Sequence, residues 1–276
     1  MSAARIRVMA PADVPPASEV LLPDVGDRRS WLEFAASHSA CTTLLAEDGA
    51  SIVGTAVGTA NGACGWLATI WVAPARRRHG LGRELTQAVR DRLAARGCRT
   101  FVLVSTEIGR ALYERMGFEV QTWYRILEAP GTTEPRDAGI RPFAPTALPA
   151  IAALDLAATG EDRRHAIELF ASPASSLVAT DGHRGIRGFV IRAPWGGGAT
   201  IGADSTTAEL LVSARLSAAG PERRVRVGLL SDNGAGLERL TRAGFRPIWS
   251  APRMIAGEAL EWHPDRIYGQ FNHAIG

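Results

Sequence analysis

The stretch that decides the fold is Ile70–Arg83, with the sequence IWVAPARRRHGLGR. An extended apolar run leads into Pro74, and three arginines and a Gly-Leu-Gly then precede a segment with leucine or valine at every fourth residue. That spacing places the apolar side chains on one face of a helix. Glycines let backbone N–H groups approach an anion closely, and a helix start carries unpaired N–H groups and about half a positive charge. The stretch therefore predicts a pyrophosphate cradle between a strand and a helix.

The same residues exclude two other phosphate-binding patterns. The dinucleotide pattern GxGxxG is absent, and the loop begins with arginines instead of glycine. All 31 basic residues are arginines, which excludes a Walker-type loop and lysine Schiff-base chemistry. Arg76, Arg77, Arg78 and Arg83 would add positive charge and forked donors to the cradle. A net charge of +3 is too small to indicate a nucleic-acid partner.

The segments around the cradle predict an α/β fold. We expect strands at Arg5–Met9, Cys41–Ala46, Ser51–Thr59, Cys64–Val72, Phe101–Val104 and Phe118–Leu127, and helices at Arg29–Ser37, from Leu81 to Leu93 and at Glu107–Met116. The dipeptides Asp48-Gly49 and Asn61-Gly62 lie between extended runs and predict hairpin turns. Pro11, Pro15 and Pro16 are expected to interrupt any long helix near the N-terminus.

The order of elements recurs in the second half of the chain. A helix ends in Gly-Phe in both halves, at Gly117-Phe118 and Gly244-Phe245. The polar, Pro- and Gly-containing segment between the halves resembles a linker. We therefore predict two copies of one small α/β domain, each a mixed, mostly antiparallel sheet flanked by helices. Their predicted bounds are residues 1–128 and 140–276, with a linker at 129–139.

The cradle resembles the acyl-CoA signature of the GNAT acyltransferases. The resemblance rests on Arg77-x-x-Gly80-x-Gly82, which follows Val72-x-Pro74 and opens a helix. It implies acetyl-CoA as cosubstrate and no metal. In that family the strand before the loop separates from its neighbour, and its free backbone groups, here of Thr69, Ile70 and Val72, pair with the pantetheine arm. The implied cofactor-binding residues are Ile70, Trp71, Val72, Arg77, Arg78, His79, Gly80, Leu81, Gly82 and Arg83.

A second segment, Ala111–Phe118, is similar to the family's A-LY-x-x-x-GF pattern. The resemblance implies that Tyr113 lies near the sulfur of CoA and gives a proton to the departing thiolate, which a phenol is suited to do. The alternative is a half-buried core tyrosine. Thr106 and Gly109 depart from the Asn and Ala that are common in the family.

The general base is less defined. Glu107 is the carboxylate nearest in sequence to Tyr113, but it suits the first turn of a helix equally well, and we favour that structural role. Glu33 and His38 lie in the segment that usually forms the acceptor wall in the family, so Glu33 is a candidate substrate-binding residue. A water chain to backbone carbonyls is the remaining option.

The second half lacks the cradle. Asp204 stands where the pyrophosphate would lie, and Leu240 takes the position of Tyr113. This pattern resembles tandem GNAT proteins with a degenerate C-terminal half. Asp162 is a candidate acceptor-binding residue, because the intact acyl-CoA site has no obvious carboxylate of its own. Around it, Asp155, Glu161 and His165 lack metal-ligand spacing, so we favour capping and salt bridges for them.

Together these features predict an N-acetyltransferase that moves an acetyl group from acetyl-CoA to a primary amine of a small molecule or peptide by direct attack in a ternary complex. The alternatives are a non-catalytic acyl-CoA-binding or interaction protein, and a transferase with a different acyl chain or acceptor atom. Cys41, Cys64 and Cys98 form no CxxC pair, which favours a reduced, cytoplasmic setting. We expect no signal peptide, membrane segment or nucleic-acid partner, and a homodimer is left open.

Overall fold

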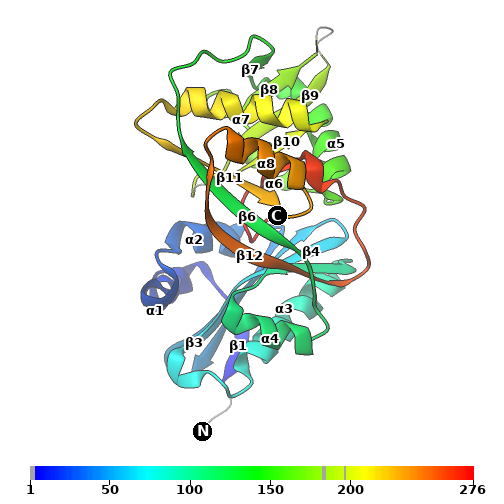
Figure 1. The fold of residues 1–276 in the computed structure, drawn as a ribbon. Coiled ribbons are helices and arrows are strands. Elements are labelled where there is room, and N and C mark those ends of the chain that lie inside the picture. The colour runs from blue at the N-terminus through cyan, green and yellow to red at the C-terminus, as the bar shows by residue number, and fades with distance from the viewer. Residues whose placement is uncertain (1–3, 182–184, 196) are drawn as a thin grey trace. The chain divides into compact units, whose positions relative to one another are not determined.

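The computed structural model describes residues 4–181, 185–195 and 197–276. These residues form two compact units, each built from more than one segment of the chain (Figure 1). Unit 1 comprises Met1–Leu103, Glu107–Glu119 and Ile255–Glu258. Unit 2 comprises Val104–Thr106, Val120–Met254 and Ala259–Gly276.

Unit 1 is built on a mostly antiparallel sheet with the strand order β1-β2-β3-β4-β5. Its strands are β1 (Arg5–Val8), β2 (Cys41–Asp48), β3 (Ser51–Asn61), β4 (Cys64–Val72) and β5 (Thr100–Val104). Its helices are α1 (Val14–Val25), α2 (Arg29–Ser37), α3 (Leu81–Ala95) and α4 (Glu107–Arg115), with short 3-10 turns at Pro11–Asp13 and Pro74–Arg76. Both predicted hairpin turns form, with Gly49 and Gly62 at φ of 61° and 65°.

Helix α3 packs closely on one face of this sheet because β3 carries two glycines on that face. A Cβ atom at Gly54 would lie 2.7 Å from Leu85 Cδ1, and one at Gly58 would lie 2.6 Å from Val89 Cγ2. On the alternate face, Thr43 of β2 donates its hydroxyl to the Ala35 carbonyl of α2 at 2.9 Å. The sheet is therefore covered by helices on both faces, with α3 and α2 on opposite sides.

The expectation that prolines interrupt the N-terminal segment was wrong. Helix α1 runs through Val14–Val25, with prolines in its first turn and Pro23 inside it. Proline is well tolerated in the first turn, because the N–H that it lacks has no intrahelical partner there. Ala17 and Leu21 of this helix are fully buried, which indicates that packing rather than propensity stabilises it.

Unit 2 contains a five-stranded sheet with the order β13-β10-β9-β8-β7 and three further paired strands in the order β12-β6-β11. Its strands are β6 (Glu119–Pro130), β7 (Ile140–Pro142), β8 (Leu177–Thr180), β9 (Ile186–Arg192), β10 (Gly198–Gly202), β11 (Arg224–Leu230), β12 (Arg246–Gly257) and β13 (Ile267–Gly269). Its helices are α5 (Leu148–Thr159), α6 (Arg164–Phe170), α7 (Ser205–Ala219) and α8 (Gly234–Arg242). Strand β6 pairs antiparallel with β11, with Leu127 opposite Val227.

The two halves repeat one helix ending, with the same backbone hydrogen bond and a glycine of positive φ. In unit 1, the N–H of Phe118 donates to the Tyr113 carbonyl at 3.0 Å, and Gly117 has a φ of 83°. In unit 2, the N–H of Phe245 donates to the Leu240 carbonyl, also at 3.0 Å, and Gly244 has a φ of 89°. A positive φ is cheap only for glycine, which explains the glycine at both ends.

The fold is therefore α/β, with sheets flanked by helices, as predicted. Strand β6 continues to Pro130, so residues 128–130 are extended, and strands β6 and β12 each contribute residues to both units. The predicted domain bounds at residues 128 and 140 remain a prediction. Within the described ranges, we find no helix with the length and apolar composition needed to cross a membrane.

Candidate acyl-CoA site

Strand β4 carries one extra residue just before the arginine-rich loop. Ala68 lies opposite Val57 and Trp71 lies opposite Thr55, so two residues of β4 face the single Ala56 of β3. Such a β-bulge bends the strand and redirects its backbone groups. Within it, Thr69 has a φ of 51°. Because Thr69 is β-branched, this conformation costs about 1–3 kcal/mol and persists only where neighbouring groups hold it.

Beyond the first part of β4, the strand leaves its parallel neighbour. The pairing with β5 covers Cys64, Gly65 and Trp66, which lie opposite Thr100–Val102. In the part of the chain that the structure describes, no residue of β4 after Trp66 pairs with β5. Ile70 and Val72 are only half-buried there. The two strands therefore open at the end that leads into the loop, as the family resemblance implied for the pantetheine arm.

The loop after β4 presents a row of unused backbone donors. Among the described residues, no hydrogen bond is made by the N–H groups of residues 78–82. Arg78 and Gly80 both have positive φ, of 65° and 88°. Helix α3 starts directly after Gly80 and has no side-chain cap. Successive N–H groups in such a turn, at a helix start, form a concave site that favours an anion.

Gly82 leaves space at this helix start. A Cβ atom there would meet Leu112 Cδ2 at 3.4 Å and Val72 Cγ2 at 3.7 Å, which are ordinary contact distances. The packing of the chain therefore does not require glycine at this position. The free space at Gly82 is therefore available to an anion bound at the helix start.

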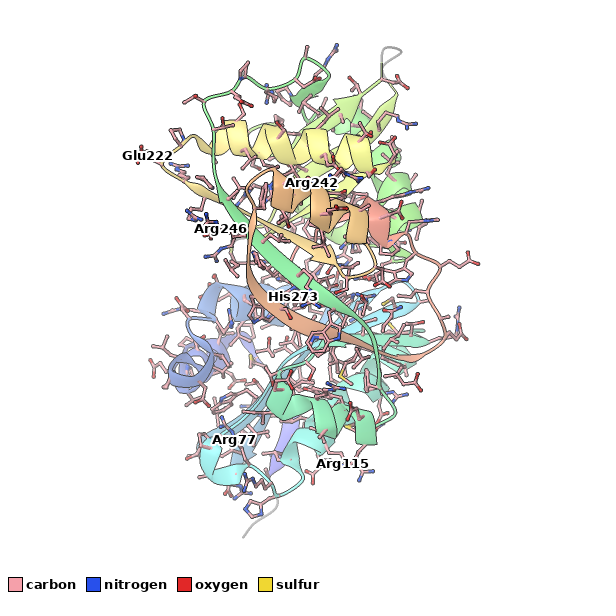
Figure 2. All side chains as sticks on the ribbon, viewed as in Figure 1. Arg77, Arg115, Glu222, Arg242, Arg246 and His273 are labelled. Atoms are coloured by element: carbon pink, nitrogen blue, oxygen red, sulfur yellow. The ribbon has the colours of Figure 1, made fainter. Side chains whose placement is uncertain are left out.

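The arginines of the loop divide into two groups. Arg77, labelled in Figure 2, lies in this loop. It donates from Nε to the Val72 carbonyl at 2.9 Å and forms an ion pair with Asp24 at the end of α1. Arg76 pairs with Asp48, the last residue of β2. These two side chains therefore hold the shape of the loop.

The remaining side chains of the loop are available to a ligand. Arg78, His79 and Arg83 are exposed, and within the described residues no side-chain partner is found for any of them. The charge that could face a phosphate therefore comes from Arg78 and Arg83 rather than from Arg77.

Tyr113 lies on α4, which packs at the beginning of α3. Leu112 faces the Gly82 position, and Arg90 of α3 donates to the Met116 carbonyl at 3.3 Å. The Tyr113 ring is 9% exposed and meets the edge of Phe118 at 6.0 Å between centroids. In the described part of the chain, its hydroxyl has no hydrogen-bond partner. Burial raises the pKa of Tyr113 to about 12, so the phenol is protonated at neutral pH.

The other predicted catalytic and acceptor residues of unit 1 do not gather around Tyr113. Glu107 is exposed in the first turn of α4, and its six-residue separation places it about 240° around the helix from Tyr113. Glu33 is exposed on α2 and forms an i,i+4 pair with Arg29. His38 accepts from the Ala40 N–H through Nδ1 at 3.2 Å, and burial, followed by the charge of Arg96, lowers its pKa.

The corresponding helix start in unit 2 is already capped. The Asp204 carboxylate accepts from the Thr207 N–H at 2.8 Å and pairs with Arg187 at 2.7 Å. The hydrogen bond from the Thr207 backbone is the main cause that lowers the pKa of Asp204. A Cβ atom at Gly202 would lie 2.5 Å from the Ala208 nitrogen, so the backbone is closed where the cradle of unit 1 is open. Leu240 is buried in the core of the unit.

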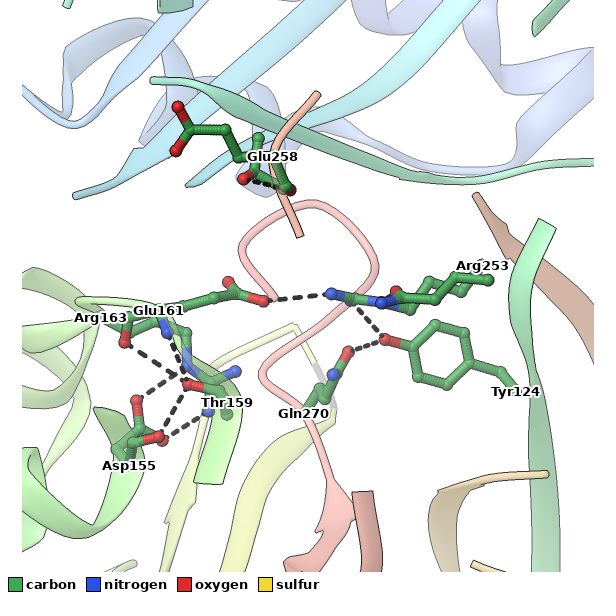
Figure 3. Close-up of polar contacts among 10 residues, drawn as sticks. Tyr124, Asp155, Thr159, Glu161, Arg163, Arg253, Glu258 and Gln270 are labelled. Carbon is green, nitrogen blue, oxygen red and sulfur yellow. Dashed lines mark hydrogen bonds and ion pairs between the residues drawn. The ribbon is translucent and has the colours of Figure 1, made fainter. Parts of the chain in front are cut away.

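The acidic cluster of unit 2 forms ion pairs, as predicted. Asp155 accepts from Arg163 Nε at 2.9 Å, and both side chains are fully buried (Figure 3). Glu161 lies 3.6 Å from Arg253, which also donates to the Tyr124 hydroxyl at 3.2 Å. Among the described residues, no group of side chains has the arrangement of a metal site.

Asp162 forms an exposed ion pair, unlike Asp155 and Glu161, whose ion pairs are buried. It pairs with Arg164 at the surface, and the hydrogen bond from Arg164 is the main cause that lowers its pKa. It belongs to unit 2, whereas the other candidate site residues belong to unit 1.

Family models match most of the chain. Residues 11–118 match the Acetyltransferase (GNAT) family, and residues 151–269 match a second model described as an Acetyltransferase (GNAT) domain. The chain belongs to the GNAT acetyltransferase family. Its two GNAT domains stand in tandem, and this membership supports an acyl-CoA-dependent acetyltransferase in general. A search of curated proteins found no match.

Several solved structures have a fold similar to that of this tandem GNAT protein. A putative acetyltransferase from Pyrococcus horikoshii aligns with a TM-score of 0.82 and 19% identity over 100% of this chain and 97% of that one. A GCN5-related N-acetyltransferase from Sphaerobacter thermophilus aligns with a TM-score of 0.64 and 18% identity, over 94% of this chain and 98% of that one. A tandem GNAT protein from the clavulanic acid biosynthesis pathway aligns with a TM-score of 0.61 and 13% identity, over 92% of this chain and 98% of that one. At these identities the likeness extends to the fold alone.

Two residues next to the site were not found from the sequence. Asp24 accepts from the Trp71 indole N–H at 2.8 Å as well as pairing with Arg77. Trp31 of α2 donates its indole N–H to the Thr69 hydroxyl at 3.0 Å. Both contacts join residues that are far apart in the chain, and neither residue belongs to a motif. A sequence signal for them would require knowledge of the bulge in β4.

Proposed function

We propose that this GNAT protein transfers an acetyl group from acetyl-CoA to a primary amine of a small molecule or peptide, using a single acyl-CoA site in unit 1. The observation that carries the proposal is the uncapped start of α3. Its open N–H groups at residues 78–82 and the free space at Gly82 occur together with two unpaired arginines, Arg78 and Arg83. The corresponding helix start of unit 2 does not offer this arrangement, because Asp204 caps it.

In this proposal the pyrophosphate binds the N–H groups of residues 78–82, with Arg78, His79 and Arg83 around it. Leu81 and Gly82 supply N–H groups of the helix start, where the helix dipole adds to the attraction. Arg77 acts through its ion pair with Asp24 by keeping the loop in shape. The pantetheine arm follows the opened edge of β4, along the backbone of Ile70, Trp71 and Val72.

The reaction needs one bond to form and one to break. The amine nitrogen attacks the carbonyl carbon of the thioester, and the C–S bond then breaks. Tyr113 gives its phenolic proton to the departing thiolate, the proton of the amine passes to solvent, and Tyr113 then regains a proton from solvent. We assign Glu107 to the first turn of α4 rather than to proton removal, because it is exposed on a different face of the helix from Tyr113.

Direct attack is favoured over an acyl-enzyme because the described cysteines are poor nucleophiles. Burial raises the pKa of Cys41 to about 11 and also raises that of Cys98. Cys64 is fully buried. The thiolate is the reactive form of cysteine, so none of the three is suited to accept the acetyl group.

Calorimetric titration with acetyl-CoA tests the site. We expect one site per chain, abolished by Gly82→Glu, because the new carboxylate would occupy the cradle and repel phosphate. Gly82→Ala is the matched control for folding, since a Cβ atom fits there without displacement. Two sites per chain would contradict our interpretation of Asp204, and no binding would favour a non-catalytic interaction protein.

Release of CoA with a panel of amines tests the transfer. The chain has no lysine, so acetylation of its own lysine side chains cannot contribute to the signal. Mass spectrometry of the acceptor then identifies the modified atom. Binding of acetyl-CoA without CoA release for any amine would favour the non-catalytic alternative, and release with longer acyl-CoA alone would indicate a different acyl donor.

A further inference from the structure

Thr69 needs support to keep its backbone in the left-handed region. Among the described residues, Thr69 and Arg78 are the two that have a positive φ and are not glycine. Arg78 lies in an exposed loop, whereas Thr69 lies inside strand β4. A β-branched residue there returns to a negative φ unless contacts oppose the change.

Two hydrogen bonds hold Thr69 from opposite ends. The Thr55 hydroxyl of β3 donates to its carbonyl at 2.9 Å, and the Trp31 indole N–H of α2 donates to its side-chain hydroxyl at 3.0 Å. Trp31 is itself fixed, since it is 6% exposed and its ring lies 5.7 Å from that of Phe34. The contact from α2 is therefore a rigid support and not a surface hydrogen bond.

The residue that Trp31 supports lies at the functionally important point of β4. Thr69 and Ile70 are the two residues opposite Ala56, and the strand has already left β5 at this point. Rotation of Thr69 to a negative φ would remove the bulge and turn the peptide groups that follow it. Those peptide groups are the ones that face the opened edge of β4.

We propose that Trp31 is a positioning residue for the acyl donor, acting through Thr69. Its indole N–H keeps Thr69 in the left-handed conformation, and this conformation directs the backbone of the bulge toward the thioester. The inference rests on the proposed function and adds to it a residue outside the loop and outside α4. Helix α2 thereby becomes part of the acyl-CoA site without touching the ligand.

A rescue experiment with glycine tests this role. Trp31→Phe keeps the ring and removes the N–H donor, and we expect kcat/KM for acetyl-CoA to fall about 10- to 100-fold because the reacting groups are misplaced. Glycine adopts a positive φ without support, so adding Thr69→Gly to Trp31→Phe should restore kcat/KM to within about threefold of the unmodified chain. Thr69→Val removes the acceptor instead and should resemble Trp31→Phe.

Trp71→Phe is the matched control. It removes another indole hydrogen bond from the same strand, but one that ends on Asp24. Adding Thr69→Gly to it should restore nothing. If Trp31→Phe leaves kcat/KM unchanged, or if glycine at position 69 fails to rescue it, Trp31 is a structural residue only and the proposal is overturned.

Thermal unfolding separates this outcome from a failure of the proposed function. Trp31→Phe should lower Tm by about 2–4 °C, and Thr69→Gly should recover part of that loss, whether or not acetyl-CoA binds. A chain that shows this coupling but binds no acetyl-CoA would refute the proposed function and the positioning role together. A chain that acetylates amines but shows no coupling would refute the positioning role alone.

Discussion

Helices α3 and α7 have the same length and occupy matching places in the two units, but they begin differently. Each has 15 residues and follows a strand of its own sheet. The start of α3 has no side-chain cap and leaves the N–H groups of residues 78–82 open in the described structure. The start of α7 is closed by Asp204, which accepts from Thr207 and pairs with Arg187.

The difference shows how one helix start can serve stability or binding. A side-chain cap satisfies the N–H groups and stabilises the protein by about 1 kcal/mol. An uncapped start forgoes this and keeps the donors for an anion. The last helices of the two units, α4 and α8, also differ at a matching position, where α4 carries Tyr113 and α8 carries Leu240, and both side chains are buried. Unit 2 closes its helix start and packs Leu240 into its core, whereas unit 1 leaves its helix start uncapped and carries a phenol at the matching position.

The largest expected effect comes from breaking the internal charge pairing of unit 2. Asp155→Asn leaves the fully buried Arg163 without its carboxylate, and we expect a loss of about 3–5 kcal/mol in the free energy of unfolding. Chemical denaturation measures it. Glu238→Gln removes the exposed partner of Arg242 and is the control, with an expected change below about 0.5 kcal/mol. Equal effects of the two variants would contradict the structural role of the buried pair.

Tyr113→Phe tests the proposed role of unit 1 in the reaction, in which Tyr113 is the proton donor. We expect kcat to fall about 100-fold with little change in the KM for acetyl-CoA, because the proton donor is lost and the ring remains. Steady-state CoA release measures both constants. Tyr268→Phe, which removes a hydroxyl bonded to Glu209 in unit 2, should lower stability without changing kcat.

The pH profile sharpens the assignment of Tyr113. Burial raises the pKa of Tyr113 to about 12, so the acid form persists as the pH rises past the usual value for tyrosine of about 10. We therefore expect no loss of kcat from ionisation of Tyr113 between about pH 7 and pH 10. A fall in kcat near pH 10 that disappears in Tyr113→Phe would show that the phenol is more exposed than the structure has it.

Removing the cap of α7 should have a moderate effect on stability and none on binding. We expect Asp204→Ala to cost about 1 kcal/mol, or about 2–4 °C in Tm. The pKa of Asp204 is lowered in the folded state, so its contribution is present above the unfolded value of about 3.9 and is lost as the pH falls through the folded pKa. Thermal unfolding at neutral and acidic pH measures this. A second acetyl-CoA site in the variant would show that the cap alone closes unit 2.

The smallest expected effect is at Asp162. Its pair with Arg164 is exposed, so Asp162→Asn should change the free energy of unfolding by less than about 0.5 kcal/mol. The informative measurement is the KM for the acceptor. If Asp162 binds the acceptor, this KM rises while that for acetyl-CoA stays constant. An unchanged acceptor KM would leave Asp162 as the surface partner of Arg164.

The sequence was sufficient to predict what depends on local pattern. The hairpin turns at Gly49 and Gly62 form, and the apolar residues spaced along α3 are buried as the helical period requires. The order of elements and the repeated Gly-Phe ending follow the same local rules. The sequence also placed the anion Asp204 where pyrophosphate would lie, but it did not predict that Asp204 caps α7 by accepting from Thr207.

What could not be predicted depends on contacts between distant residues. Helix α1 forms despite its prolines because its apolar side chains are buried by the rest of unit 1. Asp24 meets Arg77, and Trp31 meets Thr69, only after the sheet has assembled. A threonine with positive φ has no signature in a sequence, because tertiary contacts impose that conformation against the preference of the residue.

The segment Ile255–Glu258 belongs to unit 1, although it is encoded near the end of the chain. Glu258 pairs with Arg99, and its carbonyl accepts from the Thr100 hydroxyl at 2.7 Å. On the ribosome, unit 1 therefore lacks one of its pieces until nearly the whole chain has been synthesised. A nascent chain that stops after residue 139 would carry the loop and Tyr113 but not this piece. Completion of unit 1 is thus coupled in time to translation of unit 2.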